Sequence, residues 1–271
     1  MLMDHMQIKS ELIEQLIEIS KEAGKAILEV YNTDFDYQIK EDLSPLTKAD
    51  TLSNHIICER LKALTPDIPI LSEENSNIPF NIRSLWKQYW LVDPLDGTKE
   101  FIKRNGEFTV NIALIKNNRP IFGVIHVPVS NETYWGLEKK GSYFIDKNSN
   151  EIKINVSINP DSPLRIVASR SHPSIELTSC LNKIKNYELI TVGSSLKFCL
   201  IAKGDADCYP RFGATSEWDT AAGEAIARFA GGTIVNLKNK PLRYNSCDKF
   251  INPNFIVSNN ITNKEKILSM L

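Results

Sequence analysis

No segment of the sequence is apolar for long enough to cross a membrane. A spanning helix needs about 18 or more consecutive apolar residues, and no stretch approaches that length. Lys9, Glu11 and Glu14 interrupt the first segment, which therefore lacks the apolar centre of a secretory signal. We expect a cytoplasmic protein.

Cysteine is scarce. The chain has five cysteines, namely Cys58, Cys180, Cys199, Cys208 and Cys247. Their odd number and scattered spacing argue against a disulfide framework and against a zinc-binding motif. We interpret them as reduced thiols, most of them in the core.

An excess of either charge is also lacking, with 32 Lys and Arg against 33 Asp and Glu. A net charge of −1 without long runs of like charge gives no reason to expect nucleic-acid binding. Gly-x-x-x-x-Gly-Lys, Gly-x-Gly-x-x-Gly and His-Glu-x-x-His are all absent. A Walker-type ATPase, a dinucleotide-binding enzyme and a zinc protease therefore have no support.

What is present is a regular pattern of apolar residues. A chain of 271 residues can form one large domain or two interlocked ones. Apolar residues repeat every three or four positions over residues 12–30 and predict a helix, and a second helix is expected over 49–64. Strands are then predicted at residues 108–115, 121–127, 133–137, 142–145 and 152–158. They indicate a largely antiparallel sheet in the first half.

The second half alternates strands and helices. Strands are expected at 164–169, 188–192 and 255–258, and helices at 174–184, 195–203 and 220–229. The composition of residues 159–163, Asn-Pro-Asp-Ser-Pro, indicates a boundary. We therefore predict an N-terminal α+β sub-domain over residues 1–159 and a C-terminal α/β sub-domain over residues 160–271.

The most informative segment covers residues 90–98, Trp-Leu-Val-Asp-Pro-Leu-Asp-Gly-Thr. An apolar run over 85–92 predicts a buried strand, and the proline and glycine predict a turn after it. The turn would bring three oxygen ligands together at the end of the strand. They are the carboxylates of Asp93 and Asp96 and the carbonyl of Leu95.

Further acidic residues complete the pattern: Glu73, followed by Glu74, and Asp219 at a predicted helix start. Carboxylates and carbonyls are the ligands that Mg²⁺ prefers. Without a cation they would repel a phosphate dianion, and bound ions reverse that sign. A helix opened by Gly97 and Thr98 would add an anion site at its N-terminus. The pattern predicts a phosphomonoesterase that depends on a divalent metal.

Each piece alone has a plainer interpretation. Asp-Pro-x-Asp-Gly is a common turn sequence. Glu73 and Glu74 could form a solvated acidic corner, and Asp219 could be only a helix N-cap. The joint occurrence of the three pieces favours the metal site.

Together these motifs resemble the inositol monophosphatase superfamily and, within it, the bacterial 3′(2′),5′-bisphosphate nucleotidases. The resemblance covers nearly the whole chain, including residues 71–74, 93–98, 99–112, 193–199 and 209–219. Lys99-Glu-Phe101 and Pro210-Arg-Phe-Gly213 favour the nucleotidase branch over the inositol phosphatases. The resemblance implies a five-layer α-β-α-β-α sandwich, of α+β and α/β character, with a metal site between a metal-binding and a substrate-recognition sub-domain.

The resemblance also implies the ligands and the catalytic residues. Two or three Mg²⁺ ions would be held by Glu73, Asp93, the Leu95 carbonyl, Asp96 and Asp219. Glu74 would support this set without touching a metal. Asp50 and Thr98 would help to deprotonate a metal-bound water, with Glu73 as the third catalytic residue. No phosphoenzyme is expected, because no Ser or Cys lies in a recognisable motif with a base.

Four residues of the second half would surround a nucleotide by the same resemblance. They are His172, Ser194, Lys197 and Arg211, next to the shared positions Glu73, Leu95, Asp96, Gly97, Thr98 and Asp219. Lys197 and Arg211 would bind the phosphate that is not cleaved. Alternatively, His172 is a surface or satisfied core residue and Lys197 is merely solvated. Arg211 is the strongest of the four, because it lies close in sequence to Asp219.

The implied reaction is hydrolysis of adenosine 3′,5′-bisphosphate to AMP and phosphate, with a role in sulfur metabolism and sensitivity to Li⁺. The alternatives are an inositol or sugar phosphatase of the same superfamily and a noncatalytic nucleotide-binding protein. Association with the cytoplasmic face of the inner membrane is known in this branch, although no amphipathic Lys/Arg-rich anchor predicts it here. The sequence leaves open whether the protein is a monomer or a homodimer.

Overall fold

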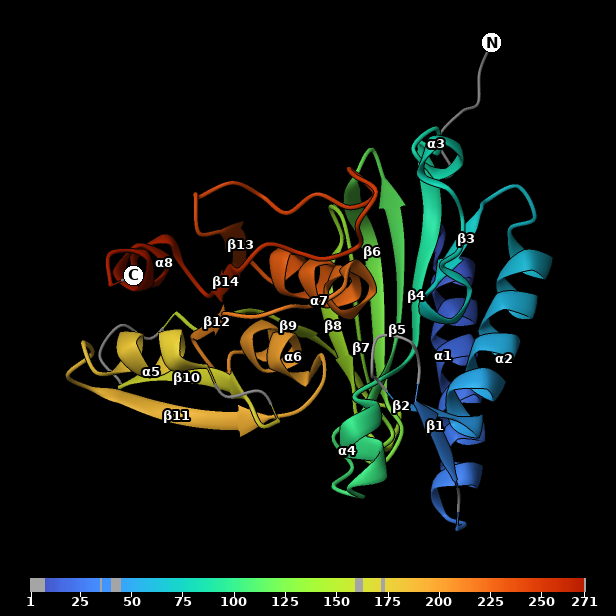
Figure 1. The fold of residues 1–271 in the computed structure, drawn as a ribbon, viewed down its shortest axis with the longest axis horizontal. Helices are drawn as coiled ribbons and strands as arrows, with labels where there is room; N and C mark the ends of the chain where they lie inside the picture. Colours follow the sequence, from blue (N-terminus) through green and yellow to red (C-terminus); the bar gives the residue numbers. More distant parts are fainter. Residues whose placement is uncertain (1–7, 35, 40–44, 159–162, 172–173, 271) are drawn as a thin grey trace.

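The computed structural model describes residues 8–34, 36–39, 45–158, 163–171 and 174–270. Most of the strands lie in two sheets, which are stacked with helices between them and on their outer faces (Figure 1). None of the helices in these ranges combines the length and the apolar character needed to cross a membrane. The sub-domain boundary expected between residues 159 and 160 lies outside the described residues.

The first sheet has seven strands in the order β3-β4-β5-β6-β7-β8-β9. Their bounds are β3 (Ile70–Ser72), β4 (Gln88–Asp96), β5 (Thr109–Lys116), β6 (Arg119–Val127), β7 (Glu132–Leu137), β8 (Gly141–Ile145) and β9 (Glu151–Ile154). β3 pairs with β4 in parallel, and every other pair is antiparallel. The expected antiparallel sheet is therefore confirmed.

Both faces of the first sheet are buried. On one face, Trp90 and Val92 pack with α1 (Ser10–Tyr31) and α2 (Lys48–Leu64), beside a ribbon of β1 (Tyr37–Ile39) and β2 (Pro45–Thr47). On the other face, Tyr89 and Leu91 belong to a core shared with α6 (Leu196–Lys203) and α7 (Glu217–Phe229). The opposite directions of adjacent side chains follow from the period of two along a strand.

The second sheet has the order β11-β10-β12-β14-β13. Its strands are β10 (Leu164–Ser169), β11 (Tyr187–Val192), β12 (Cys208–Arg211), β13 (Thr233–Asn236) and β14 (Phe255–Ser258). One face contributes Val167 and Val257 to the core around α6 and α7, and the other packs against α5 (Ile175–Leu181) and α8 (Ile261–Leu268). The layers therefore run α-β-α-β-α, as the resemblance implied (Figure 1).

The middle layer packs very closely on the first sheet. A Cβ at Gly123 of β6 would lie 2.5 Å from the backbone oxygen of Ala222 in α7, so no larger side chain fits there. A Cβ at Gly223 would lie 2.4 Å from the ring of Phe198 in α6. These glycines fix α7 against both neighbours, which matters because α7 carries Asp219.

Several predicted boundaries were wrong. β4 begins at Gln88, not Leu85, because Leu85 lies in a turn and is 79% exposed. β4 also continues through Pro94 to Asp96, since a shift of register between Asp93 and Asp96 accommodates the proline. β9 ends at Ile154, four residues before its predicted end.

Two helix predictions also needed correction. α5 ends at Leu181 and not at residue 184. α7 begins three residues before its predicted start, at Glu217, because Ser216 is the N-cap and its N–H is bonded by the side chain of Asp219 in the first turn. Short elements were missed, including β3, β12, β13 and α8. By contrast, four of the five cysteines are buried and unpaired, as expected, and Cys247 is exposed.

Candidate active site

The bulge at the end of β4 brings its acidic residues together. Asp93 is 1% exposed and accepts a hydrogen bond from the Leu95 N–H at 3.1 Å. Ser53 Oγ of α2 donates to the Pro94 oxygen at 2.7 Å and fixes the neighbouring peptide. Because Pro94 has no N–H, the strand loses a ladder donor here and the chain can bend.

Asp219 reaches the same point from α7. One ligand oxygen from each of Asp93, Asp96 and Asp219 lies within 4.8 Å of the others. The alternative interpretation, that Asp219 is only the N-cap of this helix, is wrong, because Ser216 is the N-cap. The Ser216 N–H donates to Asp219 Oδ2 at 2.9 Å, which orients the carboxylate in the first turn.

These carboxylates destabilise one another. Burial raises the pKa of Asp93 well above its usual range, and the negative charges of Glu73, Asp96 and Asp219 raise it further. Burial also raises the pKa of Asp219, with Asp96 and Glu73 adding to the effect. Every donor in the cluster is an oxygen, and the charges repel unless a cation lies between them. This donor set fits a hard divalent cation.

Glu73 and Glu74 lie in η1 (Glu73–Asn75), directly after β3, and both are partly exposed. Glu73 is close enough to raise the pKa of Asp93 and of Asp219, although it is outside the three-carboxylate group. Glu73 therefore acts electrostatically on the acidic cluster, and its role as a metal ligand stays a prediction. The parallel pairing of β3 and β4 explains this approach, because the carboxyl ends of parallel strands lie at the same sheet edge.

Asp50 and Thr98 meet beside the cluster. Asp50 is the third residue of α2, and its Oδ2 accepts hydrogen bonds from the Thr47 N–H at 2.7 Å and from Thr47 Oγ1 at 2.6 Å. Its other oxygen, Oδ1, lies 3.4 Å from Thr98 Oγ1. Thr98 opens α4 (Thr98–Ile102), and its hydroxyl is also 3.4 Å from the Leu95 oxygen.

A cleft of about 890 Å³, partly open to solvent, joins the acidic cluster to the second sheet. It contains most of the residues predicted to bind a substrate. They are Asp96, Gly97, Thr98, Ser194, Lys197, Arg211 and Asp219. The cleft is also lined by Lys99, Glu100 and Tyr209, which were not predicted. Gly97 has φ +92°, and a Cβ there would meet the Glu107 oxygen at 3.1 Å. His172 lies outside the described residues.

Arg211 and Lys197 place positive charge in this cleft. Arg211 is 8% exposed, and its Nε has no hydrogen-bond partner among the described residues. Lys197 is buried rather than solvated, so its alternative interpretation is wrong. Its Nζ donates to the Ser194 oxygen and lies 5.6 Å from the centre of the Tyr209 ring. Burial lowers the pKa of Lys197 to about 8, although Asp96 partly opposes this shift.

Asp96 is held by Ser194 and by three residues that sequence reasoning did not single out, namely Ser195, Asn111 and Thr109. Its Oδ2 accepts from Ser194 Oγ and from Ser195 Oγ, both at 2.7 Å, and lies 3.4 Å from Asn111 Nδ2. Thr109 Oγ1 lies 2.7 Å from Ser194 Oγ and extends the network. The sequence of β5 contained a signal for this network, because two polar residues, Thr109 and Asn111, interrupt an otherwise apolar strand. Ser194 lines the cleft and bonds the carboxylate of Asp96, and its contact with substrate stays a prediction.

Comparison with known proteins agrees with these features. The model of the inositol monophosphatase family matches residues 8–271. The 3′(2′),5′-bisphosphate nucleotidase CysQ of Salmonella typhimurium is 46% identical over 249 residues, which is 91% of this chain and 99% of that protein. CysQ of Escherichia coli (strain K12) is 45% identical over the same shares. The crystal structure of CysQ from Bacteroides thetaiotaomicron has a TM-score of 0.81 and 41% identity, and covers 91% of this chain and 97% of that one.

Proposed function

This chain belongs to the inositol monophosphatase family, and on that premise we propose that it hydrolyses the 3′-phosphate of adenosine 3′,5′-bisphosphate to give AMP and phosphate. The names of the CysQ relatives support this substrate. One observation carries the assignment: two buried cations, Lys197 and Arg211, line the same cleft as the acidic cluster. The site would thus offer separate places for two phosphates.

We further propose that Mg²⁺ is the cofactor and that two or three ions bind. Glu73, Asp93, Asp96, Asp219 and the Leu95 oxygen would hold them, since all are oxygen ligands. Bound Mg²⁺ would lower the pKa of a water molecule and offset the charge of the phosphate. The mutual repulsion of Asp93 and Asp219 supports this proposal, because a cation would remove it.

Asp50 and Thr98 would manage the proton of the attacking water. Thr98 Oγ1 would accept a hydrogen bond from the water and donate its own proton toward Asp50 Oδ1, 3.4 Å away. The two bonds from Thr47 fix the Asp50 carboxylate so that its other oxygen faces Thr98. The water oxygen bonds to phosphorus and the ester P–O bond breaks. The leaving 3′-oxygen then takes up a proton from solvent and Asp50 returns the proton it received to solvent, so one water is consumed.

The phosphate that is not cleaved would pair with Arg211 and Lys197. The Arg211 Nε–H lacks a partner among the described residues, and a buried donor without a partner costs about 1–3 kcal/mol. A phosphate oxygen would remove that cost and make a charge-assisted bond. An inositol monophosphate has only one phosphate, so it would occupy the acidic cluster and leave the two cations unpaired.

Phosphate release by the purified protein tests the proposal. We would compare adenosine 3′,5′-bisphosphate, inositol 1-phosphate and fructose 1,6-bisphosphate in Mg²⁺, with Asp93→Asn and excess EDTA as blanks. Strong preference for the nucleotide is the expected result. Preference for either other substrate would keep the metal site and overturn the substrate. Nucleotide binding without phosphate release above the blanks would favour the noncatalytic alternative.

The same premise extends to location. We propose that the protein works in a reducing compartment, the cytoplasm. The unpaired thiols of Cys58, Cys180, Cys199 and Cys208 support this, since all four are buried without disulfides. Fractionation of cells that express the chain, with a membrane fraction as comparison, is the measurement that tests it.

A further inference from the structure

A buried arginine outside the cleft connects the segment between Glu73 and Asp93 with the start of α7, which carries Asp219. Arg83 ends α3 (Phe80–Arg83), in the segment that runs from η1 to β4, and its side chain is 1% exposed. That segment has Glu73 at one end and Asp93 at the other. Arg83 therefore belongs to the same stretch of backbone as two of the proposed metal ligands, although it touches neither.

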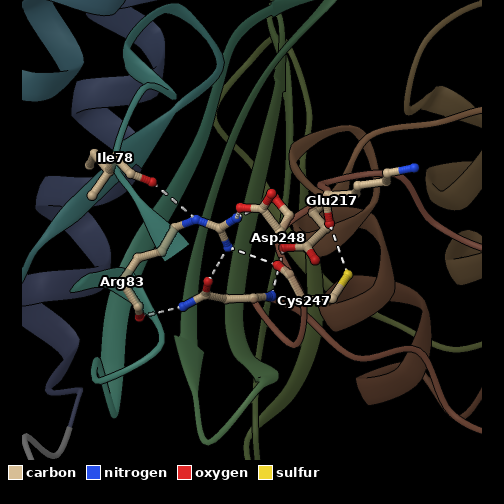
Figure 2. A network of polar contacts seen from close by, with 7 residues as sticks. Ile78, Arg83, Glu217, Cys247 and Asp248 are labelled. Atoms are coloured by element: carbon tan, nitrogen blue, oxygen red, sulfur yellow. Dashed lines mark hydrogen bonds and ion pairs between the residues drawn. The ribbon is translucent and has the colours of Figure 1, made fainter. Parts of the chain in front are cut away.

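The guanidinium of Arg83 holds one loop, residues 245–252, mainly by donating to backbone and amide oxygens. It donates to Asn245 Oδ1, to the Cys247 oxygen at 3.1 Å and to the Asp248 oxygen (Figure 2). The Arg83 backbone oxygen in turn accepts from Asn245 Nδ2 at 2.6 Å. The ring of Phe250 lies 4.2 Å from the guanidinium carbon. Lysine cannot reproduce this planar set of donors.

The loop in turn holds the first turn of α7. The Asn245 N–H donates to Glu217 Oε2 at 2.7 Å, and the Phe250 oxygen accepts from the Glu217 N–H at 2.8 Å. Asn252 Nδ2 donates to the Ser216 oxygen at 2.8 Å. Trp218 also packs on Phe250, with 5.1 Å between ring centres. Asp219 is the next residue of this turn.

We propose that Arg83 is a positioning residue for the metal site, an inference that rests on the proposed function. Through the 245–252 loop it fixes the distance of Asp219 from Asp93 and Asp96. The glycine contacts of α7 hold the helix near its middle, and the Arg83 contacts hold its N-terminal end. A small shift of that end would separate the carboxylates, and cation affinity depends on their spacing.

The test measures Mg²⁺ binding directly, by isothermal titration calorimetry on the full chain without substrate. Arg83→Lys keeps the charge and removes the planar donors, and we expect its Mg²⁺ affinity to fall about tenfold. Asn245→Gly is the milder variant, because Asn245 has φ +52° and glycine tolerates that backbone. The double variant should bind no more weakly than the weaker single one, since both act through one connection.

Arg165→Met is the matched control. Arg165 pairs with Asp207 at 2.8 Å between β10 and the residue before β12, away from α7. In EDTA the Arg165→Met variant should unfold at a lower temperature than the wild type, and its Mg²⁺ affinity should be unchanged. Turnover of Arg83→Lys should recover at high Mg²⁺ concentration, which a general loss of stability would not produce.

Three outcomes decide the matter. Weaker Mg²⁺ binding by both Arg83→Lys and Asn245→Gly, with recovery of turnover, supports the inference. Wild-type affinity in these variants, with only a lower unfolding temperature, overturns the inference alone and makes Arg83 a purely structural residue. Failure of the wild-type chain to bind Mg²⁺ overturns the metal site of the proposed function, and this inference with it.

Discussion

Ser195 Oγ lies 2.7 Å from Asp96 Oδ2 and also 2.7 Å from the backbone oxygen of Asp219. One hydroxyl at the start of α6 therefore links two acidic residues from different elements, Asp96 of β4 and Asp219 of α7. It has a single proton, which it can donate to only one of them at a time. Asn111 Nδ2 donates to the same hydroxyl at 3.0 Å and keeps it oriented.

Loss of this hydroxyl should weaken metal binding. For Ser195→Ala we expect about a tenfold loss of Mg²⁺ affinity, the usual effect of removing a group that orients a ligand. Calorimetric titration with Mg²⁺ measures it, and Ser130→Ala, an exposed serine bonded to Glu132, is the control. A higher KM for the nucleotide at unchanged Mg²⁺ affinity would place Ser195 among the substrate contacts instead.

Asp93→Asn should separate stability from activity. The pKa of Asp93 is raised, so the folded state holds its proton more tightly than the unfolded state does. Its stability contribution is thus present at acid pH and is lost as the pH rises through the raised pKa. The neutral amide avoids that loss, so without metal the variant should unfold a few degrees higher at pH 7 than the wild type, while turnover disappears. Thermal unfolding in EDTA measures this, and a lower unfolding temperature would contradict it.

Thr98→Ala should affect the rate and leave metal affinity mostly intact. Its hydroxyl bridges toward Asp50 and is not part of the acidic cluster. We expect kcat to fall about 100-fold, within the range for loss of proton-transfer assistance. Thr98→Ser, which retains the hydroxyl, should recover much of the rate. If Thr98→Ala and Asp93→Asn showed the same Mg²⁺ dependence, this division of roles would be wrong.

Arg211→Ala should distinguish bisphosphates from monophosphates. The lost charge-assisted bond is typically worth about 1.5–3 kcal/mol, so KM for the bisphosphate should rise roughly 10- to 100-fold. KM for a monophosphate such as inositol 1-phosphate should change little. Steady-state kinetics with both substrates measures the difference. Equal effects on the two substrates would remove the support for the nucleotide assignment.

Lys197 should make nucleotide binding depend on pH. With its pKa lowered to about 8, the side chain is cationic at pH 7 and loses its charge as the pH rises through that value. KM for the bisphosphate should therefore increase between pH 7.5 and 9.5, roughly, in a titration of one group. Lys197→Met should show a higher KM that no longer varies over this range. A wild-type KM independent of pH would exclude this role.

The strands and long helices followed from local pattern, and their errors have local causes. The apolar run from Leu85 looked continuous with β4, but Leu85 is exposed in the turn that precedes the strand. Short elements such as β12 gave too few residues for a period to be recognised. Ser195, Thr109 and Asn111 were missed because a hydroxyl or amide inside a sequence carries no sign of the carboxylate it will meet.

The sequence by itself predicted the chemistry of the proposed site: oxygen ligands at Glu73, Asp93, Asp96 and Asp219 in their flanking motifs, with Asp50 and Thr98 nearby. These signals are readable because each depends on residues that are adjacent along the chain. The tertiary structure decided which side chains converge across the sub-domains, how Ser194 and Ser195 hold Asp96, and how Arg83 reaches α7. Such contacts join residues up to 165 positions apart, and only the packed layers bring them within hydrogen-bonding distance.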